Sequence, residues 1–320
     1  MRAIVVSEPG GPEVLAEREY PDPEAGPGQV VVEVAAAGVN FIDIYHRSGV
    51  YPQQLPYVPG SEGAGTVIAA GEGVSGLAPG DRVAWCTAPG SYAEQVTVPA
   101  DQAVPVPDGI DLTVAAAVML QGLTAHYLCH SAFAVQPGQV AVVHAAAGGV
   151  GLLLTQMIKS LGGIVVATTS GGAKAGLATR AGARYVAAYD EFPDVVRTVT
   201  AGRGADVVFD GVGQATFDAS LAALRPRAMM VLFGGSSGQV PPFNLQRLNN
   251  GGSLFLTRPT LAHYVADRAE LLWRAADVFG AIGKGELNVR VGAEYPLSDA
   301  PRAHEDLAAR RSTGKVILIP

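Results

Sequence analysis

Cysteine is scarce in this chain of 320 residues, which contains Cys86 and Cys129 and no other. Two cysteines so far apart in sequence cannot build a disulfide framework, and they cannot supply a cysteine-rich zinc site. We therefore expect each of them to be an ordinary thiol packed in the interior.

Positive charge is also in deficit, and long apolar runs are absent. The formal net charge is -7 and the isoelectric point lies near 5.4, which argues against nucleic acid as the main partner. No uninterrupted apolar run reaches the ~18 to 20 residues of a membrane-spanning helix. Residues 1–6 resemble a strand and not a signal peptide, so we expect a cytoplasmic protein without a membrane partner.

The chain is rich in apolar residues, and their pattern changes along its length. Hydrophobic residues make up 48% and charged residues 16%, which is typical of a globular protein long enough for two cores. Short apolar strands broken by Gly and Pro predict a small β-barrel domain first. Strand and helix then alternate, which predicts a parallel, doubly wound α/β sheet. The expected strands are 3–7, 30–36, 65–70, 82–85 and 92–98, then 139–145, 163–169, 185–189, 205–210, 228–233 and 253–257, and finally 288–294 and 316–319, with long helices at 111–131 and 266–284.

A glycine turn stands between the apolar strand at 139–145 and an apolar helix. Ala145, Gly148 and Gly151 follow the spacing of a variant G-x-G-x-x-G fingerprint, in which the glycines let a pyrophosphate approach the backbone at a helix N-terminus. A second strand begins about twenty residues after the turn, as a βαβ unit requires. The run therefore predicts a dinucleotide site, and the alternative is a structural turn without a ligand.

The chain resembles the zinc-independent quinone oxidoreductases of the medium-chain dehydrogenase/reductase superfamily, the group that includes zeta-crystallin. The resemblance covers nearly the whole length. It implies a Rossmann domain for NADPH at 123–261 and a discontinuous GroES-like catalytic domain at 1–122 and 262–320, with the substrate in the cleft between them. The matching motifs lie at 11–15, 37–43, 47–51, 59–65, 80–83, 122–125, 144–151, 233–238, 256–259 and 313–316.

The positions that hold zinc in the zinc-dependent relatives carry other residues here. Asn40 stands where those alcohol dehydrogenases have a cysteine, and Ser61 replaces the histidine of their Gly-His-Glu motif. A catalytic zinc needs thiolate or imidazole ligands, so we expect no native metal site. Without a metal to stabilise an alkoxide, hydride transfer to an electron-poor quinone is favoured over alcohol oxidation.

Six residues are candidates for the catalytic site. Asn40 is predicted to offer its amide to a carbonyl or to the nicotinamide ribose, with Asp43 orienting its neighbours; turn-stabilising roles are the alternative. Tyr45 and Tyr51 are predicted to stack beside nicotinamide or quinone and to donate a hydrogen bond, and simple packing is the alternative. Gln121 and Thr124 face the cleft by family resemblance, and ordinary helix-start residues are the alternative.

The choice of cofactor is predicted from the end of the second strand of the alternating part. NAD sites usually carry Asp or Glu there, whereas this strand ends in Thr168, Thr169 and Ser170, followed by Lys174. Hydroxyls and a lysine attract a 2'-phosphate, which favours NADPH over NADH. The resemblance implies these cofactor residues: Ala147, Gly148, Gly149, Val150, Gly151, Ser170, Lys174, Tyr189, Val212, Gly213, Phe233, Gly234, Ser236, Leu256, Arg258 and Lys315.

The sequence thus predicts an NADPH:quinone oxidoreductase with a small-molecule quinone as substrate. The alternative enzyme is an NADPH-dependent reductase of 2-alkenals or enones, and the alternative outside catalysis is a structural or binding role. The apolar segment at 252–257 is predicted to form a sheet edge, and relatives pair such edges across a two-fold axis. We therefore expect a homodimer, and a tetramer is the alternative.

Overall fold

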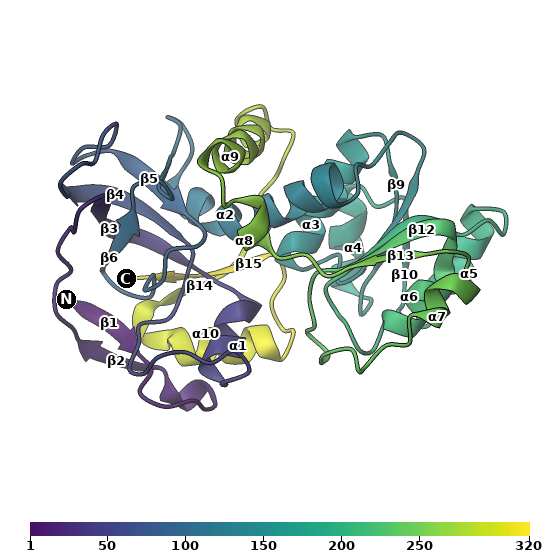
Figure 1. Ribbon diagram of the computed structural model, residues 1–320, viewed down its shortest axis with the longest axis horizontal. Coiled ribbons are helices and arrows are strands. Elements are labelled where there is room, and N and C mark those ends of the chain that lie inside the picture. The colour runs from purple at the N-terminus through teal and green to yellow at the C-terminus, as the bar shows by residue number, and fades with distance from the viewer. The chain divides into compact units, whose positions relative to one another are not determined.

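The computed structural model describes residues 1–320, which divide into two compact units. The first unit contains Met1–Leu123 and Val265–Pro320, and the second contains Thr124–Tyr264. The chain leaves the first unit and later returns to it, so that both chain ends belong to this unit (Figure 1).

A seven-stranded sheet forms the body of the first unit, in the order β14-β15-β3-β4-β5-β7, with β6 paired to β3. Neighbouring strands are antiparallel except for β14 and β15. Valine recurs along β3, and its branched side chain suits a strand that is buried along most of its length. The strands are β3 (Gln29–Val39), β4 (Gly63–Ala70), β5 (Arg82–Trp85), β6 (Gln95–Pro99), β7 (Val104–Pro105), β14 (Val291–Pro296) and β15 (Lys315–Ile319), and β1 (Arg2–Val5) pairs separately with β2 (Ala16–Glu19).

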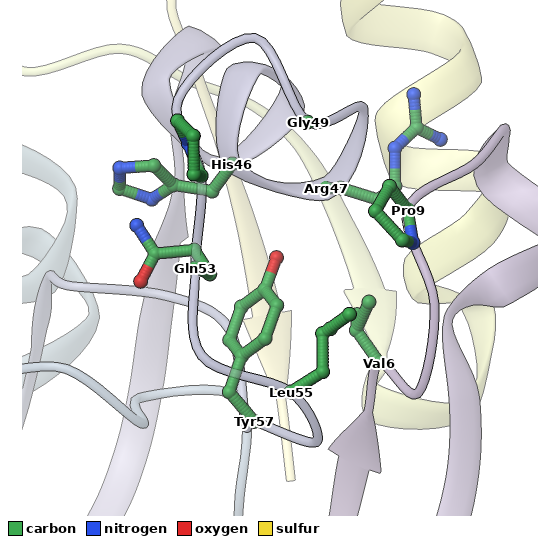
Figure 2. Close-up of a pocket in the computed structure, with 9 residues that line it drawn as sticks. Val6, Pro9, His46, Arg47, Gly49, Gln53, Leu55 and Tyr57 are labelled. Carbon is green, nitrogen blue, oxygen red and sulfur yellow. The ribbon is translucent and has the colours of Figure 1, made fainter.

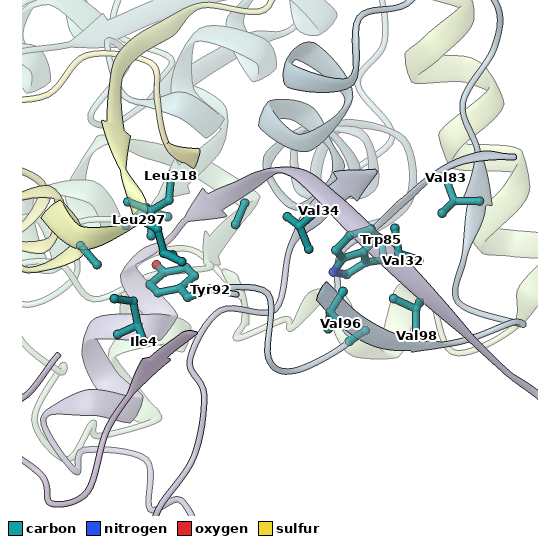
Figure 3. Close-up of a cluster of buried hydrophobic side chains, with 14 of the residues drawn as sticks. Ile4, Val32, Val34, Val83, Trp85, Tyr92, Val96, Val98, Leu297 and Leu318 are labelled. Atoms are coloured by element: carbon teal, nitrogen blue, oxygen red, sulfur yellow. The ribbon is translucent and has the colours of Figure 1, made fainter. Parts of the chain in front are cut away.

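Several helices accompany the sheet of the first unit, which has one apolar core. They are α1 (Phe41–Arg47), α9 (Arg268–Gly283), α10 (Ala300–Ala308) and the first part of α2 (Leu112–Tyr127). Figure 3 shows the core, in which Val34 of β3, Trp85 of β5 and Leu318 of β15 are buried together. These strands come from distant parts of the sequence, so the C-terminal segment completes the core that the N-terminal segment begins.

The second unit is built on a six-stranded parallel sheet in the order β10-β9-β8-β11-β12-β13. Successive strands move outward from β8 to β10, and β11 then starts again on the other side of β8. The strand order therefore reverses between β8 and β11, the place where open α/β sheets bind ligands at their carboxyl edge. The strands are β8 (Val140–Val143), β9 (Ile164–Thr168), β10 (Tyr185–Ala187), β11 (Ala205–Asp210), β12 (Leu224–Leu232) and β13 (Phe255–Thr257), and the helices are α3 (Gly149–Ser160), α4 (Ala173–Ala181), α5 (Phe192–Val199), α6 (Phe217–Ala223), α7 (Gln246–Asn250) and α8 (Leu261–Tyr264).

The structure differs from the sequence-based expectations at several elements, of which β2 and α2 bear most on the interpretation. Strand β2 was not expected, because its sequence is mostly charged and its side chains are largely exposed. Helix α2 continues through a π-helical turn to Ala132, and this stretch of 21 residues is long and apolar enough to cross a membrane by length and composition. Polar residues such as Gln121 and Thr124 interrupt its apolar run, so a search for continuous runs misses it. Since 72% of its apolar window is buried, it has the character of a core helix.

Candidate active site

Asn40 lies between the end of β3 and the first residue of α1, and it is the N-cap residue of this helix. The Asn40 backbone N–H donates to Asp43 Oδ2 at 2.8 Å, which satisfies one of the amides at the helix start. Both side chains are buried, Asn40 at 4% and Asp43 at 1% exposure. The cap fixes the backbone at the point where the sequence places two of its catalytic candidates.

The Asn40 side chain is held by a buried ion pair between Glu62 and Lys315. Its amide nitrogen donates to Glu62 Oε2 at 2.8 Å and to the Gly38 carbonyl at 3.3 Å. Its carbonyl oxygen accepts from Lys315 Nζ at 2.7 Å, and Lys315 also donates to Glu62 Oε2. Every polar atom of the Asn40 amide therefore has a partner, and no N–H is left for a substrate carbonyl or a ribose.

This network gives two of the predicted site residues protein partners that the sequence did not reveal. Asn40 is predicted to donate to substrate or ribose, and in this structure its N–H groups donate to Glu62 and Gly38. Lys315, which the resemblance implies as a cofactor residue, belongs to the first unit, and only 1% of it is exposed. Its ammonium neutralises Glu62, because a buried carboxylate requires a charged partner. The contact joins residues from opposite ends of the chain, which local sequence does not reveal.

The former zinc-ligand positions do not assemble a metal site. Ser61 precedes Glu62, whose carboxylate is already bonded to Lys315, Asn40 and the backbone N–H of Leu120. Nowhere in the chain do three or more His, Cys, Asp or Glu side chains come together in an arrangement that could hold a metal ion. The donor set therefore does not fit zinc, which prefers thiolate and imidazole.

Asp43 lies at the centre of a second buried chain of hydrogen bonds. Tyr92 donates its hydroxyl proton to Asp43 Oδ2 at 2.9 Å, and the same oxygen of Tyr92 lies 3.1 Å from His304 Nε2. Burial raises the pKa of Asp43 from 3.8 to about 7, although the bonds from Asn40 and Tyr92 oppose the rise. Burial also lowers the pKa of His304 to about 3, so that this imidazole is neutral at pH 7.

Tyr45 and Tyr51 are brought together at the end of α1. The Tyr51 backbone N–H donates to the Tyr45 carbonyl at 3.1 Å, and the two rings meet edge to face with centroids 5.5 Å apart. Tyr51 is 36% exposed, so part of its side chain is open to a ligand. A tyrosine can stack against a planar ring and donate a hydrogen bond to it.

A pocket of about 120 Å³ lies beside α1 (Figure 2). Figure 2 shows the Tyr57 hydroxyl directed towards α1, with His46 and Gln53 on one side. The Tyr57 hydroxyl and two guanidinium nitrogens of Arg47 are buried there without a protein partner. Small-molecule sites usually exceed ~300 Å³, so this volume suits water molecules and not a dinucleotide.

The remaining catalytic candidates, Gln121 and Thr124, lie one turn apart on α2. Gln121 is half-buried and Thr124 is 6% exposed. The division between the units falls between them, after Leu123.

In the second unit, the glycine turn follows β8 and starts α3 at Gly149, with Gly148 as the preceding cap residue. A Cβ atom on Gly151 would lie 2.4 Å from the Ala145 carbonyl oxygen and 2.7 Å from Ala146 Cα. Only glycine allows the helix to pack this closely on the turn, as in the dinucleotide fingerprint. The first amides of α3 have no partner within the helix and can bind an anion. Ala147, Gly148, Gly149, Val150 and Gly151 thus form a cradle that fits a pyrophosphate.

The loops after β11 and β12 also meet closely at this edge. A Cβ atom on Gly213 would lie 2.7 Å from the Gly238 carbonyl oxygen, and one on Gly234 would lie 2.5 Å from the Gly211 carbonyl oxygen. The Ser236 backbone N–H donates to the Gly211 carbonyl at 3.2 Å. The predicted cofactor residues of these loops, Val212, Gly213, Phe233, Gly234 and Ser236, therefore form one connected surface.

The end of β9 and the start of α4 carry the candidates for the 2'-phosphate. Ser170 is exposed just after the strand, and Lys174 is the second residue of α4. Tyr189 follows β10, and its ring is stacked against His144 with centroids 6.0 Å apart. No carboxylate lies between Thr168 and Lys174 to repel a phosphate.

The last strand of the sheet brings Leu256 and Arg258 to the same edge. Leu256 lies within β13, and Arg258 follows it with one guanidinium nitrogen donating to the Leu232 carbonyl at 3.2 Å. The structure therefore places every cofactor candidate from Ala147 to Arg258 near the carboxyl edge of one sheet, whereas Lys315 belongs to the first unit.

Comparisons with known proteins match both units. Residues 26–108 match the alcohol dehydrogenase GroES-like domain, and residues 149–266 match the zinc-binding dehydrogenase family. The chain is 45% identical to a quinone oxidoreductase of Pseudomonas aeruginosa, with 97% of each chain covered. The chain belongs to the quinone oxidoreductase family.

Two further relatives of the family bear on its chemistry. A crystal structure of Escherichia coli quinone oxidoreductase complexed with NADPH is 40% identical, covers 100% of both chains and has a TM-score of 0.98. A 2-haloacrylate reductase of a Burkholderia species is 38% identical, with 99% of this chain and 98% of that protein covered. The predicted combination of a GroES-like domain with a Rossmann domain is confirmed.

Sequence reasoning missed the buried polar residues that support both predicted sites in this member of the family. Glu62, Tyr92 and His304 support α1, and His144 and Asp210 lie below the cofactor loops. The available signal was a polar residue at the end of an apolar strand, as Asp210 is in β11. The tertiary structure determines which distant residues such side chains contact.

Proposed function

We propose that this chain is a zinc-independent NADPH:quinone oxidoreductase, which transfers a hydride from NADPH to a quinone. The observation that carries the proposal is similarity to quinone oxidoreductases over 97% of the chain, together with a glycine cradle that only a glycine at position 151 permits. The unit that contains 124–264 binds the cofactor in this proposal, and the first unit supplies the groups that meet the acceptor.

The residues at the carboxyl edge of the second sheet have the chemistry that NADPH requires. The backbone amides of 149–151 face the pyrophosphate, since the start of α3 favours negative charge. Ser170, Lys174 and Tyr189 bind the 2'-phosphate, and the loops at 212–213 and 233–236 bind the ribose and carboxamide of the nicotinamide. Bound NADPH supplies the hydride.

The first unit orients the acceptor. At positions 40 and 61 it carries Asn and Ser in place of the thiolate and imidazole that zinc prefers. Tyr45 and Tyr51 stack beside the acceptor, and an accessible hydroxyl donates a hydrogen bond to its carbonyl oxygen. Asn40 and Asp43 act indirectly, because their bonds fix the start of the helix that carries Tyr45. A quinone needs no Lewis acid, since it gains aromatic character as it accepts electrons.

The second candidate function is reduction of an activated carbon–carbon double bond, as in a 2-alkenal or enone. The 38% identity to a 2-haloacrylate reductase favours it, because such an acceptor also has its double bond conjugated to a carbonyl-type group. The same aromatic pair and the same cofactor site serve both reactions.

We further propose that the protein is a cytoplasmic homodimer. Strand β13 is the edge of the second sheet, and Phe255 on it is 57% exposed. An uncovered apolar edge strand tends to pair with another strand, and a two-fold axis lets two copies pair their β13 edges.

The proposed function is tested by initial rates of NADPH oxidation with 1,4-benzoquinone, using the purified chain before and after dialysis against a chelator. We expect turnover that the chelator leaves unchanged, and elemental analysis that finds no stoichiometric zinc. No quinone-dependent oxidation would refute the activity, and loss of activity that zinc restores would refute its independence of metal.

A further inference from the structure

His144, which directly follows β8, is fully buried and bonded at both ring nitrogens. Nδ1 lies 2.8 Å from Thr168 Oγ1 at the end of β9, and Nε2 lies 2.8 Å from Ser220 Oγ on α6. Burial lowers the pKa of His144, so the ring is neutral at pH 7. The imidazole thus ties the ends of two neighbouring strands to a helix below the cofactor loops.

Asp210 ends β11 and is also fully buried. Its Oδ1 accepts hydrogen bonds from the backbone N–H groups of Val212 at 2.7 Å and Gly213 at 2.9 Å. Its Oδ2 accepts from Thr216 Oγ1 at 2.7 Å and lies 3.4 Å from Ser220 Oγ. One carboxylate therefore fixes the loop after β11 and the start of α6 at the same time.

The direction of the hydrogen bonds follows from the single proton of Ser220. Its hydroxyl lies 2.7 Å from the Thr216 carbonyl oxygen, which can only accept, so Ser220 donates there or to Asp210. His144 must then donate from Nε2 to Ser220 Oγ and accept at Nδ1 from Thr168. All the groups in this network have partners, and in either case His144 carries its proton on Nε2.

The backbone of Asp210 extends the same support to the next loop. Its carbonyl oxygen accepts from the N–H groups of Phe233 at 2.9 Å and Gly234 at 3.2 Å. Strands β9, β8 and β11 are neighbours in the sheet, so the network underlies the point where the strand order reverses.

We propose that Asp210, with Thr216, Ser220 and His144, is a positioning network that sets the shape of the NADPH-binding loops at 211–213 and 233–234. The inference rests on the proposed function, because it takes NADPH as the ligand of this edge. Asp210 does not touch the cofactor in this account. Asp210 holds Val212 and Gly213 in the conformation that contacts NADPH. Its replacement therefore weakens cofactor binding more than it weakens the fold.

Asp206 provides a matched control at the opposite end of the same strand. It is 3% exposed, accepts the Val140 N–H at 2.8 Å, and is paired with Arg203 and Arg225. Asp206→Asn therefore removes a buried carboxylate of β11 without touching a cofactor loop. Thr155 of α3 is a second control, because its buried hydroxyl has no hydrogen-bond partner.

The experiment compares Asp210→Asn with Asp206→Asn, and Thr216→Val with Thr155→Val, by NADPH titration and by thermal unfolding without cofactor. We expect Asp210→Asn to raise the Kd for NADPH roughly tenfold or more, the effect of about 1.4 kcal/mol. Asp206→Asn should leave the Kd for NADPH within about twofold of the parent value, even if it lowers Tm as much as Asp210→Asn does. The reason is that Asp206 and its arginine partners are remote from the cofactor loops. Thr216→Val should raise the Kd about threefold, a small hydrogen-bond effect, and Thr155→Val should not.

Equal effects of Asp210→Asn and Asp206→Asn on the Kd would overturn the proposal, as would an unchanged Kd in Asp210→Asn. If Asp210→Asn does not fold, the threonine pair decides, and equal Kd values for Thr216→Val and Thr155→Val would be contrary to it. A parent chain that binds no NADPH defeats the inference and the proposed function together. A chain that binds NADPH but reduces no quinone defeats the proposed function alone.

Discussion

Lys315 donates a hydrogen bond to Asn40 Oδ1 at 2.7 Å, although the two residues are 275 positions apart in the chain. The same ammonium is paired with Glu62, so a lysine supplies the positive charge beside a position where zinc-dependent relatives carry a metal ligand. The C-terminal strand thereby organises the start of the helix that carries Tyr45.

Replacing this lysine tests how strongly the network supports the first unit. Lys315→Met leaves the Glu62 carboxylate buried without its cation, which should lower the free energy of unfolding by about 3–5 kcal/mol. The double variant Lys315→Met with Glu62→Gln should recover much of the loss, because the unpaired charge is gone. Urea denaturation measures both, and a loss below about 1 kcal/mol for the single variant would contradict the account.

Gly151→Ala should disturb the cofactor cradle. Its Cβ would meet the Ala145 carbonyl oxygen at 2.4 Å, so the start of α3 must move, at a cost of about 1–3 kcal/mol. Affinity for NADPH should fall with it. Gly280→Ala is the control, since no atom lies near the position of the added Cβ on the exposed face of α9. This variant should gain about 1 kcal/mol in free energy of unfolding. Urea denaturation measures the stability of both variants, and NADPH titration measures their cofactor affinity. Equal changes in the two glycine variants would contradict the role of Gly151.

The raised pKa of Asp43 predicts a specific dependence of stability on pH. Between its ordinary pKa of 3.8 and the folded value of about 7, the folded chain keeps a proton that the unfolded chain releases. The contribution of Asp43 to stability therefore falls as the pH rises through this range, by up to about 1.4 kcal/mol per pH unit, and is level above it.

Comparison with Asp43→Asn isolates this contribution, because asparagine keeps an oxygen for the Asn40 N–H but does not titrate. Urea denaturation of both proteins at about pH 5, 6, 7 and 8 should show the parent losing stability relative to the variant up to pH 7. A parent that gains relative stability over that range would indicate a lowered pKa and contradict the burial argument.

Lys174→Ala tests the choice of NADPH over NADH. Loss of a charge-assisted bond to the 2'-phosphate should raise KM for NADPH about tenfold and leave KM for NADH unchanged. Lys159→Ala, which removes an exposed lysine from the far end of α3, is the control for charge alone. Equal changes for the two cofactors would place the phosphate elsewhere.

Local sequence was sufficient for the features that depend on neighbours in the chain. The glycine turn, the alternating strands and helices, and the absence of an acidic residue after Thr168 all follow from short segments. The discontinuous first unit was expected from the return of strands at the C-terminus. Strand β2 was not expected, because its charged side chains are exposed and give no apolar alternation.

The parts of the site that could not be predicted are the ones built from distant residues. Nothing near Lys315 in sequence marks it as the partner of Glu62, and its position fits a phosphate ligand equally well until the fold is known. The same holds for Tyr92 and His304, which meet across 212 positions. Residue types and spacing predict what a side chain can do, and packing decides which partner it has.

The most direct test of the account compares kcat/KM for 1,2-naphthoquinone and for a 2-alkenal, with NADPH as donor under the same conditions. We predict a clear preference for the quinone, because its gain in aromatic character drives hydride acceptance without a metal or a strong proton donor. If the 2-alkenal is preferred by about tenfold, which corresponds to about 1.4 kcal/mol in the transition state, the chain is an enone reductase and the quinone assignment is wrong.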